Sequence, residues 1–133
     1  MRYELTKDLE CGNAMVDNEH RELLQAVNKL LDACSQGNGR KSIKPTADFL
    51  LKYVATHFAH EEQLQQKVNY PNIDAHKKFH AEYTKKLKDI TAAIPDTDAS
   101  LLDLSNLNRH IAVLISHIKI EDKRLCEYIN SKK

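Results

Sequence analysis

Apolar residues recur every three or four positions along most of the chain, which is the pattern of helices that bury one face. The pattern covers four long stretches, each separated from the next by a short polar segment. It predicts helices over residues of about 17–36, 42 or 45 to 68, 72–94 and 101–129.

The predicted ends of these helices carry ordinary boundary residues. Asp17 is expected to cap the first helix with its carboxylate, and Gly37 and Gly39 are expected to end it. Asn69-Tyr70-Pro71-Asn72 should break the second helix, because the residue before a proline avoids the helical conformation. Pro95-Asp96-Thr97-Asp98 is expected to be the loop before the last helix.

Four helices joined by short links predict an all-α fold, an up-down-up-down antiparallel four-helix bundle. The chain has only 3 glycines and 3 prolines among 133 residues, which agrees with long helices and few turns. We expect one domain over residues 1–133, with an irregular N-terminal arm over about residues 1–16.

Composition excludes several classes of protein. The formal net charge is +1, whereas nucleic-acid binders and polybasic membrane anchors present a basic face. No apolar run approaches the roughly 20 residues of a membrane span, and the first residues do not resemble a secretory signal. We therefore expect a cytoplasmic protein whose 3 cysteines, with no CxxC spacing, are reduced thiols.

The most informative positions are polar residues on faces that must point inward. A buried imidazole or carboxylate costs several kcal/mol (roughly 2–7) unless it is paired, hydrogen-bonded or bound to a metal. One such histidine is usually a satisfied core residue, but seven such groups on four helices favour a shared site. They are His20, His57, Glu61, His76, His80, His117 and Asp122.

The spacing of these residues brings several of them together. His57 and Glu61 are four residues apart, as are His76 and His80, so each pair projects from one helix face. The last pair, His117 and Asp122, is five apart, about 140° around an ideal helix. A local widening of the helix would bring that pair closer.

Five imidazoles and two carboxylates are too many ligands for one ion and suit two. Imidazole with carboxylate is typical of Fe, Zn, Mn or Cu sites, whereas Mg or Ca prefers oxygen ligands. Glu61 and Asp122 are natural bridges, because each carboxylate has two oxygens. Three histidines on one ion and two on the other would leave the second ion an open coordination position.

The order of these ligands resembles the hemerythrins, particularly the single-domain bacterial ones. That family has a histidine, then HxxxE, HxxxH and HxxxxD on four successive helices. The resemblance covers about Leu9 to Tyr128. The matching segments are Val16-Asp17-Asn18-Glu19-His20-Arg21-Glu22-Leu23, His57-Phe58-Ala59-His60-Glu61-Glu62, His76-Lys77-Lys78-Phe79-His80 and His117-Ile118-Lys119-Ile120-Glu121-Asp122.

The resemblance implies a non-haem centre of two Fe ions joined by an oxo or hydroxo group. It assigns one iron to His76, His80 and His117, the other to His20 and His57, and both bridges to Glu61 and Asp122. It also implies that O2 binds reversibly at the iron held by two histidines, in a pocket beneath Leu114, and we expect Phe58 to be a wall of that pocket.

One departure from the family concerns the pocket. The chain has 0 tryptophans, where relatives often carry one near the start and one just before the pocket leucine. Tyr3 and Val113 are expected to fill those places.

Three alternatives to an O2 carrier stay open at this stage. The chain could be the sensing domain of a signalling protein that reports O2, NO or redox state, with a partner protein that the sequence does not identify. It could be a peroxidase-like or NO-handling enzyme that takes peroxide or small anions at the open iron, or it could be a zinc-bound or metal-free bundle. His60 is expected at the rim of the site, and His110 at the bundle boundary or beside the ligands.

Overall fold

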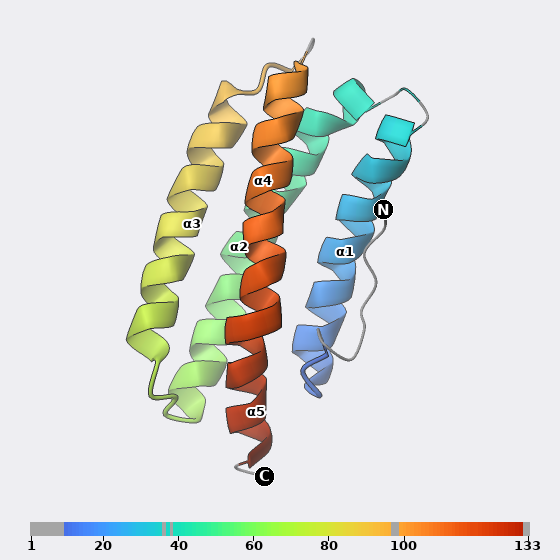
Figure 1. Cartoon of the computed structure of the whole chain (residues 1–133). Coiled ribbons are helices and arrows are strands. Elements are labelled where there is room, and N and C mark those ends of the chain that lie inside the picture. Colours follow the sequence, from blue (N-terminus) through green and yellow to red (C-terminus); the bar gives the residue numbers. More distant parts are fainter. Residues whose placement is uncertain (1–9, 36, 38, 97–98, 132–133) are drawn as a thin grey trace.

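The computed structural model describes residues 10–35, 37, 39–96 and 99–131, and its long helices lie side by side as a bundle (Figure 1). Successive helices run in alternating directions, so the predicted all-α, up-down-up-down arrangement is confirmed. Tyr3 lies outside the described residues. The elements are α1 (Ala14–Ser35), α2 (Gly39–Lys67), α3 (Ile73–Ala93), α4 (Leu101–His117), η1 (Ile118–Asp122) and α5 (Lys123–Ser131).

The start of α1 differs from the prediction. The helix begins at Ala14, and the side chain of Asn13 accepts a hydrogen bond from the backbone N–H of Val16 at 3.2 Å, as an N-cap does. Asp17 is therefore not the cap. Its carboxylate instead accepts hydrogen bonds from the N–H groups of Cys11 (2.6 Å) and Gly12 (3.2 Å), which fastens the preceding segment to the helix.

The other helix ends lie close to the predicted ones. Gly37 has a positive φ of 81° directly after α1, whereas Gly39 is already the first residue of α2, ahead of the predicted start. The turn before Pro71 contains Asn69 with φ 55°. Ser100 caps α4 through a reciprocal capping box with Asp103, which we did not predict from the sequence.

The last helical stretch is widened in the middle. Residues Ile118–Asp122 form a π-helix, η1, between α4 and α5, so the stretch predicted as one α-helix is continuous but locally unwound. A π turn pairs residues five apart and is frequent at functional sites. The structure therefore has the local widening of the helix that would bring His117 and Asp122 closer together.

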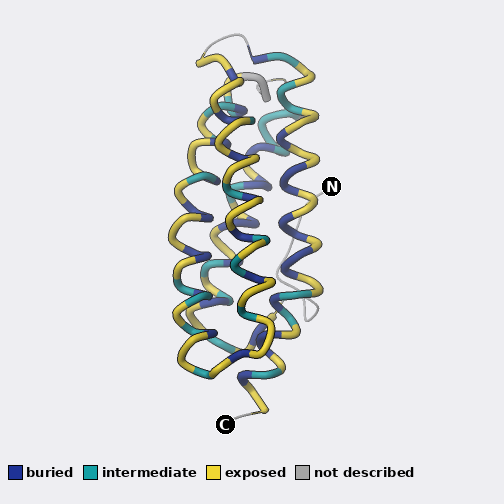
Figure 2. The backbone as a smooth tube through the Cα atoms, turned by 90° about the vertical axis from the view of Figure 1, so that its left-hand side faces the viewer, coloured by how far each residue is buried: buried dark blue, intermediate teal, exposed yellow. Residues whose placement is uncertain are grey.

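Each long helix buries one face along its length (Figure 2). The main apolar cluster draws on α1 to α4 and η1, with fully buried leucines such as Leu30, Leu50 and Leu107. Such burial stabilises the fold by roughly 1.5–3 kcal/mol for each large side chain. The apolar packing therefore fixes the helices whose polar residues make the site.

The prediction that all cysteines are reduced thiols is wrong. Cys11, before α1, and Cys126, in α5, form a disulfide across a Cα–Cα distance of 5.0 Å. Cys34 is a free thiol. The two bridged residues are 115 positions apart in sequence, so only the packing of the segment around Cys11 against α5 brings them together.

Candidate metal centre

The structure brings all seven predicted site residues to one place inside the bundle. Every long helix contributes, and all seven side chains are buried. The residues are His20 from α1, His57 and Glu61 from α2, His76 and His80 from α3, His117 from α4 and Asp122 from η1.

Asp122 lies between four of the five histidines. Its Oδ1 atom lies 3.1 Å from Nε2 of His117 and 3.8 Å from Nε2 of His76. Its Oδ2 atom lies 3.5 Å from Nε2 of His20 and 3.9 Å from Nε2 of His57. The two oxygens of one carboxylate therefore face two different sets of imidazoles.

Glu61 repeats this arrangement. Its Oε1 atom lies 3.3 Å from Nε2 of His80, and its Oε2 atom lies 3.5 Å from Nε2 of His57. Two groups of potential ligand atoms result, each with all of its atoms within 4.8 Å of one another. One is His76, His80 and His117, and the other is His20, His57, Glu61 and Asp122.

The candidate ligand atoms are buried but have no hydrogen-bond partner in the described structure. The Nε2 atoms of all five histidines and both oxygens of Glu61 and Asp122 are buried and make no hydrogen bond of good geometry within the described structure. Buried polar atoms are normally satisfied, because an orphaned one costs about 1–3 kcal/mol. Nine such atoms facing one another fit a site that binds cations.

Charge interactions within the cluster shift several pKa values. Burial alone would raise the pKa of Asp122, but its interactions with His117, His20 and His57 outweigh that effect and hold it well below the usual range. Burial would likewise lower the pKa of His57, but Glu61, Asp122 and Glu19 raise it well above its usual value. Without a metal, these groups favour the charged forms that pair with each other.

The α3 histidines differ from one another. Burial lowers the pKa of His76, and the attraction of Asp122 and Glu61 does not compensate for it. The pKa of His80 is raised despite burial, because the carboxylates of Glu61 and Glu62 both stabilise its protonated form. The neutral His76 is already in the protonation state that a metal ligand needs.

Three polar residues outside the predicted set contact the opposite ring nitrogens of the histidines. Glu19 lies 3.3 Å from Nδ1 of His57, and Glu62 lies 2.9 Å from Nδ1 of His80. Gln65 contacts Nδ1 of His76. A group that accepts the Nδ1 proton fixes the tautomer in which Nε2 is free to bind a metal.

We did not predict these three residues, although their positions in the sequence give a signal. Glu19 and Glu62 are the chain neighbours of His20 and Glu61, and Gln65 follows Glu61 by four positions on the same face of α2. The amide nitrogen of Gln65 lies next to Nδ1 of His76, and rotation of the amide by 180° would place its oxygen there as an acceptor for the Nδ1 proton. Gln65 is fully buried against His76.

The remaining histidines lie outside the two ligand groups. His60 has a side chain 38% exposed, and its Nδ1 atom lies 2.9 Å from the second oxygen of Glu19, so it lies at the rim as expected. His110 stacks on Tyr83 at a ring distance of 3.9 Å, and its Nε2 atom donates to the carbonyl oxygen of Tyr83. His110 is buried, and its partner in both of these interactions is Tyr83, which is not a candidate ligand.

The two predicted pocket residues are both buried. Leu114 is fully enclosed in the main apolar cluster. Phe58 stacks on the ring of His80 at 3.8 Å, which places it against the group of three histidines.

No helix in the described part of the chain combines the length and the apolar character that crossing a membrane requires.

Comparison with known proteins gives one family model and several similar relatives. The family model described as the hemerythrin HHE cation binding domain matches residues 11–129. Myohemerythrin of Theromyzon tessulatum is 27% identical over 122 residues, 90% of this chain and 88% of its own length. Bacteriohemerythrin of Campylobacter jejuni is 23% identical over 129 residues, 95% of this chain and 94% of its own.

A third relative is longer than the region it shares with this chain. Bacteriohemerythrin of Pseudomonas aeruginosa is 33% identical over 82 residues, which are 62% of this chain but 53% of the relative. The chain therefore matches about half the length of that relative. No solved structure gave a significant match.

Proposed function

Because the chain belongs to the hemerythrin family, whose members bind O2 at an iron site, we propose that it binds O2 reversibly at a pair of iron ions inside the bundle. In this proposal His76, His80 and His117 hold one ion, and His20 and His57 hold the other. Glu61 and Asp122 bridge the two. The role is storage, delivery or scavenging of O2 rather than turnover of a substrate.

The observation that supports this proposal most directly is the way the two carboxylates divide their oxygens. Oδ1 of Asp122 faces His76 and His117, while Oδ2 faces His20 and His57. One carboxylate oriented in this way would be able to ligate two ions at once. A single ion would leave one of the two groups of imidazoles unused.

The charges around the cluster also suit two divalent ions. Two Fe(II) ions bring four positive charges, and Glu61 and Asp122 remove two of them. Glu19 and Glu62, whose carboxylates contact the ligand histidines, remove the other two. The four carboxylates thus offset the charge of the two ions before the oxo or hydroxo group is counted, and this matters because an uncompensated buried charge is expensive.

The unequal number of histidines supplies the place for O2. With similar coordination preferences, the ion that has two imidazoles keeps a free position that the ion with three does not. When bound, the iron pair supplies the electrons that O2 withdraws on binding. The protein's contribution is to fix the ligands, keep water out of the buried cluster and hold the histidine tautomers through Glu19, Glu62 and Gln65.

Iron loading tests the proposal directly. We would load the metal-free protein with Fe(II) under anaerobic conditions, measure iron per chain, and then admit and remove O2 through several cycles. The proposal expects two irons per chain, absorption typical of bridged ferric iron under O2, and return to a colourless ferrous state when O2 is removed.

Two variants make the result specific to the assigned residues. His60→Ala removes a rim histidine and should leave two irons per chain, whereas His57→Ala removes an assigned ligand and should abolish O2 binding. One iron per chain in the unmodified protein, or irreversible oxidation at the first exposure to O2, would reject the proposed function.

A further inference from the structure

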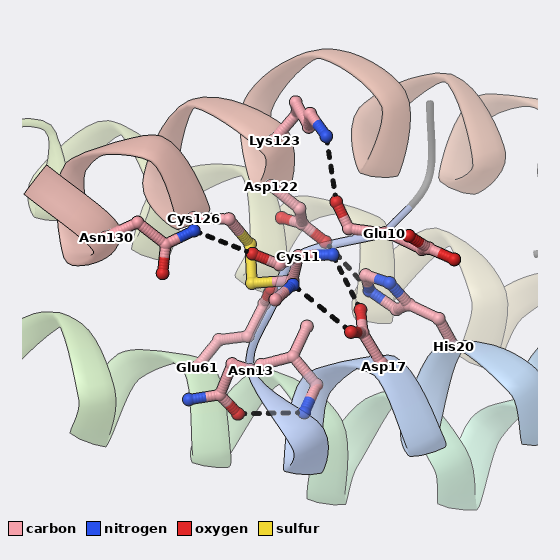
Figure 3. Close-up of a disulfide and its surroundings, with 12 residues drawn as sticks. Glu10, Cys11, Asn13, Asp17, His20, Glu61, Asp122, Lys123, Cys126 and Asn130 are labelled. Atoms are coloured by element: carbon pink, nitrogen blue, oxygen red, sulfur yellow. Dashed lines mark hydrogen bonds and ion pairs between the residues drawn. A yellow bond between two sulfur atoms is a disulfide. The ribbon is translucent and has the colours of Figure 1, made fainter. Parts of the chain in front are cut away.

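The disulfide lies beside three of the candidate ligand residues, His20, Glu61 and Asp122 (Figure 3). Its two sulfurs belong to a small buried cluster that Val16 and Leu64 complete. Each helix that contributes to this cluster also contributes a site residue about one turn away. Val16 precedes His20 by four positions, Leu64 follows Glu61 by three, and Cys126 follows Asp122 by four.

One helical turn is about 5.4 Å along the axis, so the residues of this cluster are separated from the candidate ligands by about one turn of helix. Cys126 is joined to Asp122 by a single turn of backbone at the η1–α5 junction. Both cysteines are buried, with exposed fractions of 5% for Cys11 and 2% for Cys126. Large redox proteins therefore cannot reach the sulfurs while the segment is in place.

The segment that carries Cys11 is held by hydrogen bonds that do not depend on the disulfide. The backbone N–H of Cys11 donates to Asp17 at 2.6 Å, and the side-chain amide of Asn130 donates to the carbonyl oxygen of Cys11 at 3.0 Å. Lys123 also donates to the carbonyl oxygen of Glu10 at 2.9 Å. These contacts keep the sulfurs facing each other after reduction, as a pair that cycles between two states requires.

We propose that Cys11 and Cys126 are a redox-active pair that exchanges electrons with the metal pair. In the forward step the two thiols form the S–S bond and give up two electrons and two protons. The electrons reduce two Fe(III) ions to Fe(II), and the protons pass to solvent beside the half-buried carboxylate of Asp17. A small dithiol then breaks the S–S bond and is itself oxidised to a disulfide.

This inference rests on the proposed function, because it assumes two irons at the site. It assigns to the disulfide a redox role in addition to linking two segments of the chain. O2-binding iron that is lost to the ferric state no longer binds O2, and one dithiol carries the two electrons that restore both ions.

The test starts from Cys34→Ser protein, so that only the pair can titrate. The cysteines are reduced with a small dithiol, which is removed, and the protein is loaded with Fe(II) anaerobically. Two equivalents of ferricyanide per chain then oxidise the irons. The proposal expects the ferric absorption to decay while two alkylatable thiols per chain, counted by mass spectrometry, are lost.

Three comparisons make this result specific. The same protein with its disulfide already formed should keep its ferric absorption at least tenfold longer. Zinc-loaded and metal-free dithiol protein should retain both thiols after the same ferricyanide treatment, since neither contains iron that can mediate the oxidation. Cys126→Ala protein, checked by circular dichroism for its helical content, should behave as the disulfide form does.

Ferric absorption that persists beside two intact thiols would overturn the inference and leave the disulfide a structural link. Equal loss of thiols in the zinc-loaded protein would overturn it too. Failure of the proposed function is seen separately, because iron content and reversible O2 binding are measured on the disulfide form before the thiols are reduced.

Discussion

The Nε2 atom of His117 lies 3.1 Å from Oδ1 of Asp122, although the two residues are five positions apart on one helical stretch. In a regular α-helix they would point about 140° apart. The π-helix η1 begins immediately after His117 and ends at Asp122, so the widened turn is what brings the imidazole and the carboxylate together. The helix therefore departs from regular α-helical geometry at the residue that is the candidate bridging ligand, Asp122.

Removing the Asp122 carboxylate should affect metal binding more than any other single change. Asp122→Ala takes away the group that faces four histidines, so we expect at most one tightly bound ion per chain instead of two. In metal-free protein it should also lower the free energy of unfolding, because His57 loses one of its buried partners, although Glu61 and Glu19 still face it. Metal analysis and denaturant unfolding measure the two effects.

Glu61→Ala is the matched variant, since Glu61 faces only two of the histidines. It should weaken metal binding less than Asp122→Ala does. Equal iron content in Asp122→Ala and unmodified protein would contradict the bridging role of Asp122.

Glu19→Gln should weaken metal binding on the side with two histidines. The carboxylate of Glu19 contacts Nδ1 of His57, and loss of such a partner costs about 10–100-fold in metal affinity. Glu62→Gln should have a similar effect on the side of His80. Competitive titration with Co(II), whose spectrum reports its ligands, separates the two sides.

His60→Ala is the control for this prediction. His60 contacts the same Glu19 carboxylate, but it is partly exposed and belongs to neither ligand group. Its loss should change cobalt affinity by less than about threefold. An effect as large as that of Glu19→Gln would mean that Glu19 acts through His60 rather than through His57.

The apolar pattern was sufficient to predict the four helices, their alternating directions and the gathering of seven polar residues at one place. It could not reveal the disulfide, because the proximity of Cys11 and Cys126 depends on how the segment around Cys11 packs against α5. It also misplaced the cap of α1, because Asn13 and Asp17 are both good capping residues and only the structure shows which of them accepts the Val16 N–H.

The partners of the ligand histidines were missed for a different reason. Acidic residues in proteins are mostly exposed, so the residue type of Glu19 and Glu62 alone does not indicate a contact with the site. Their contacts depend on neighbouring helices, since Glu19 reaches from α1 to His57 on α2 and Glu62 from α2 to His80 on α3. Helix spacing along one chain segment does not specify such contacts.

The pKa values of His57 and His76 should be shifted in opposite directions in the metal-free protein. The pKa of His57 is raised, so its contribution to stability is complete below about pH 6.5 and is lost as the pH rises through the raised pKa. The pKa of His76 is lowered, so its contribution is present above about pH 6.5 and is lost as the pH falls. Imidazole NMR shifts measured against pH report both.

Zinc should change the pH dependence of stability. Metal binding requires neutral imidazoles and releases their protons, so stabilisation by zinc should grow as the pH rises from about 6 to 8.

His57→Asn tests the prediction for the metal-free protein. It should remove the loss of stability that is expected as the pH rises through the raised pKa of His57. A pKa of His57 at or below that of His76 would contradict the assigned charge interactions.

Leu114→Ala tests whether the apolar residue that the family resemblance places over the O2 site protects it. The side chain is fully buried, so truncation should lower the free energy of unfolding by about 2–5 kcal/mol. The opened space should also admit water and small anions, and we expect autoxidation of the O2-bound protein to be at least several-fold faster. Leu107→Ala is the matched control, because Leu107 is equally buried in the same cluster and lies ten positions before His117 on α4. Its truncation should cost similar stability and leave autoxidation unchanged, so equal acceleration in both variants would show that loosened packing, and not the position of Leu114, controls the reaction.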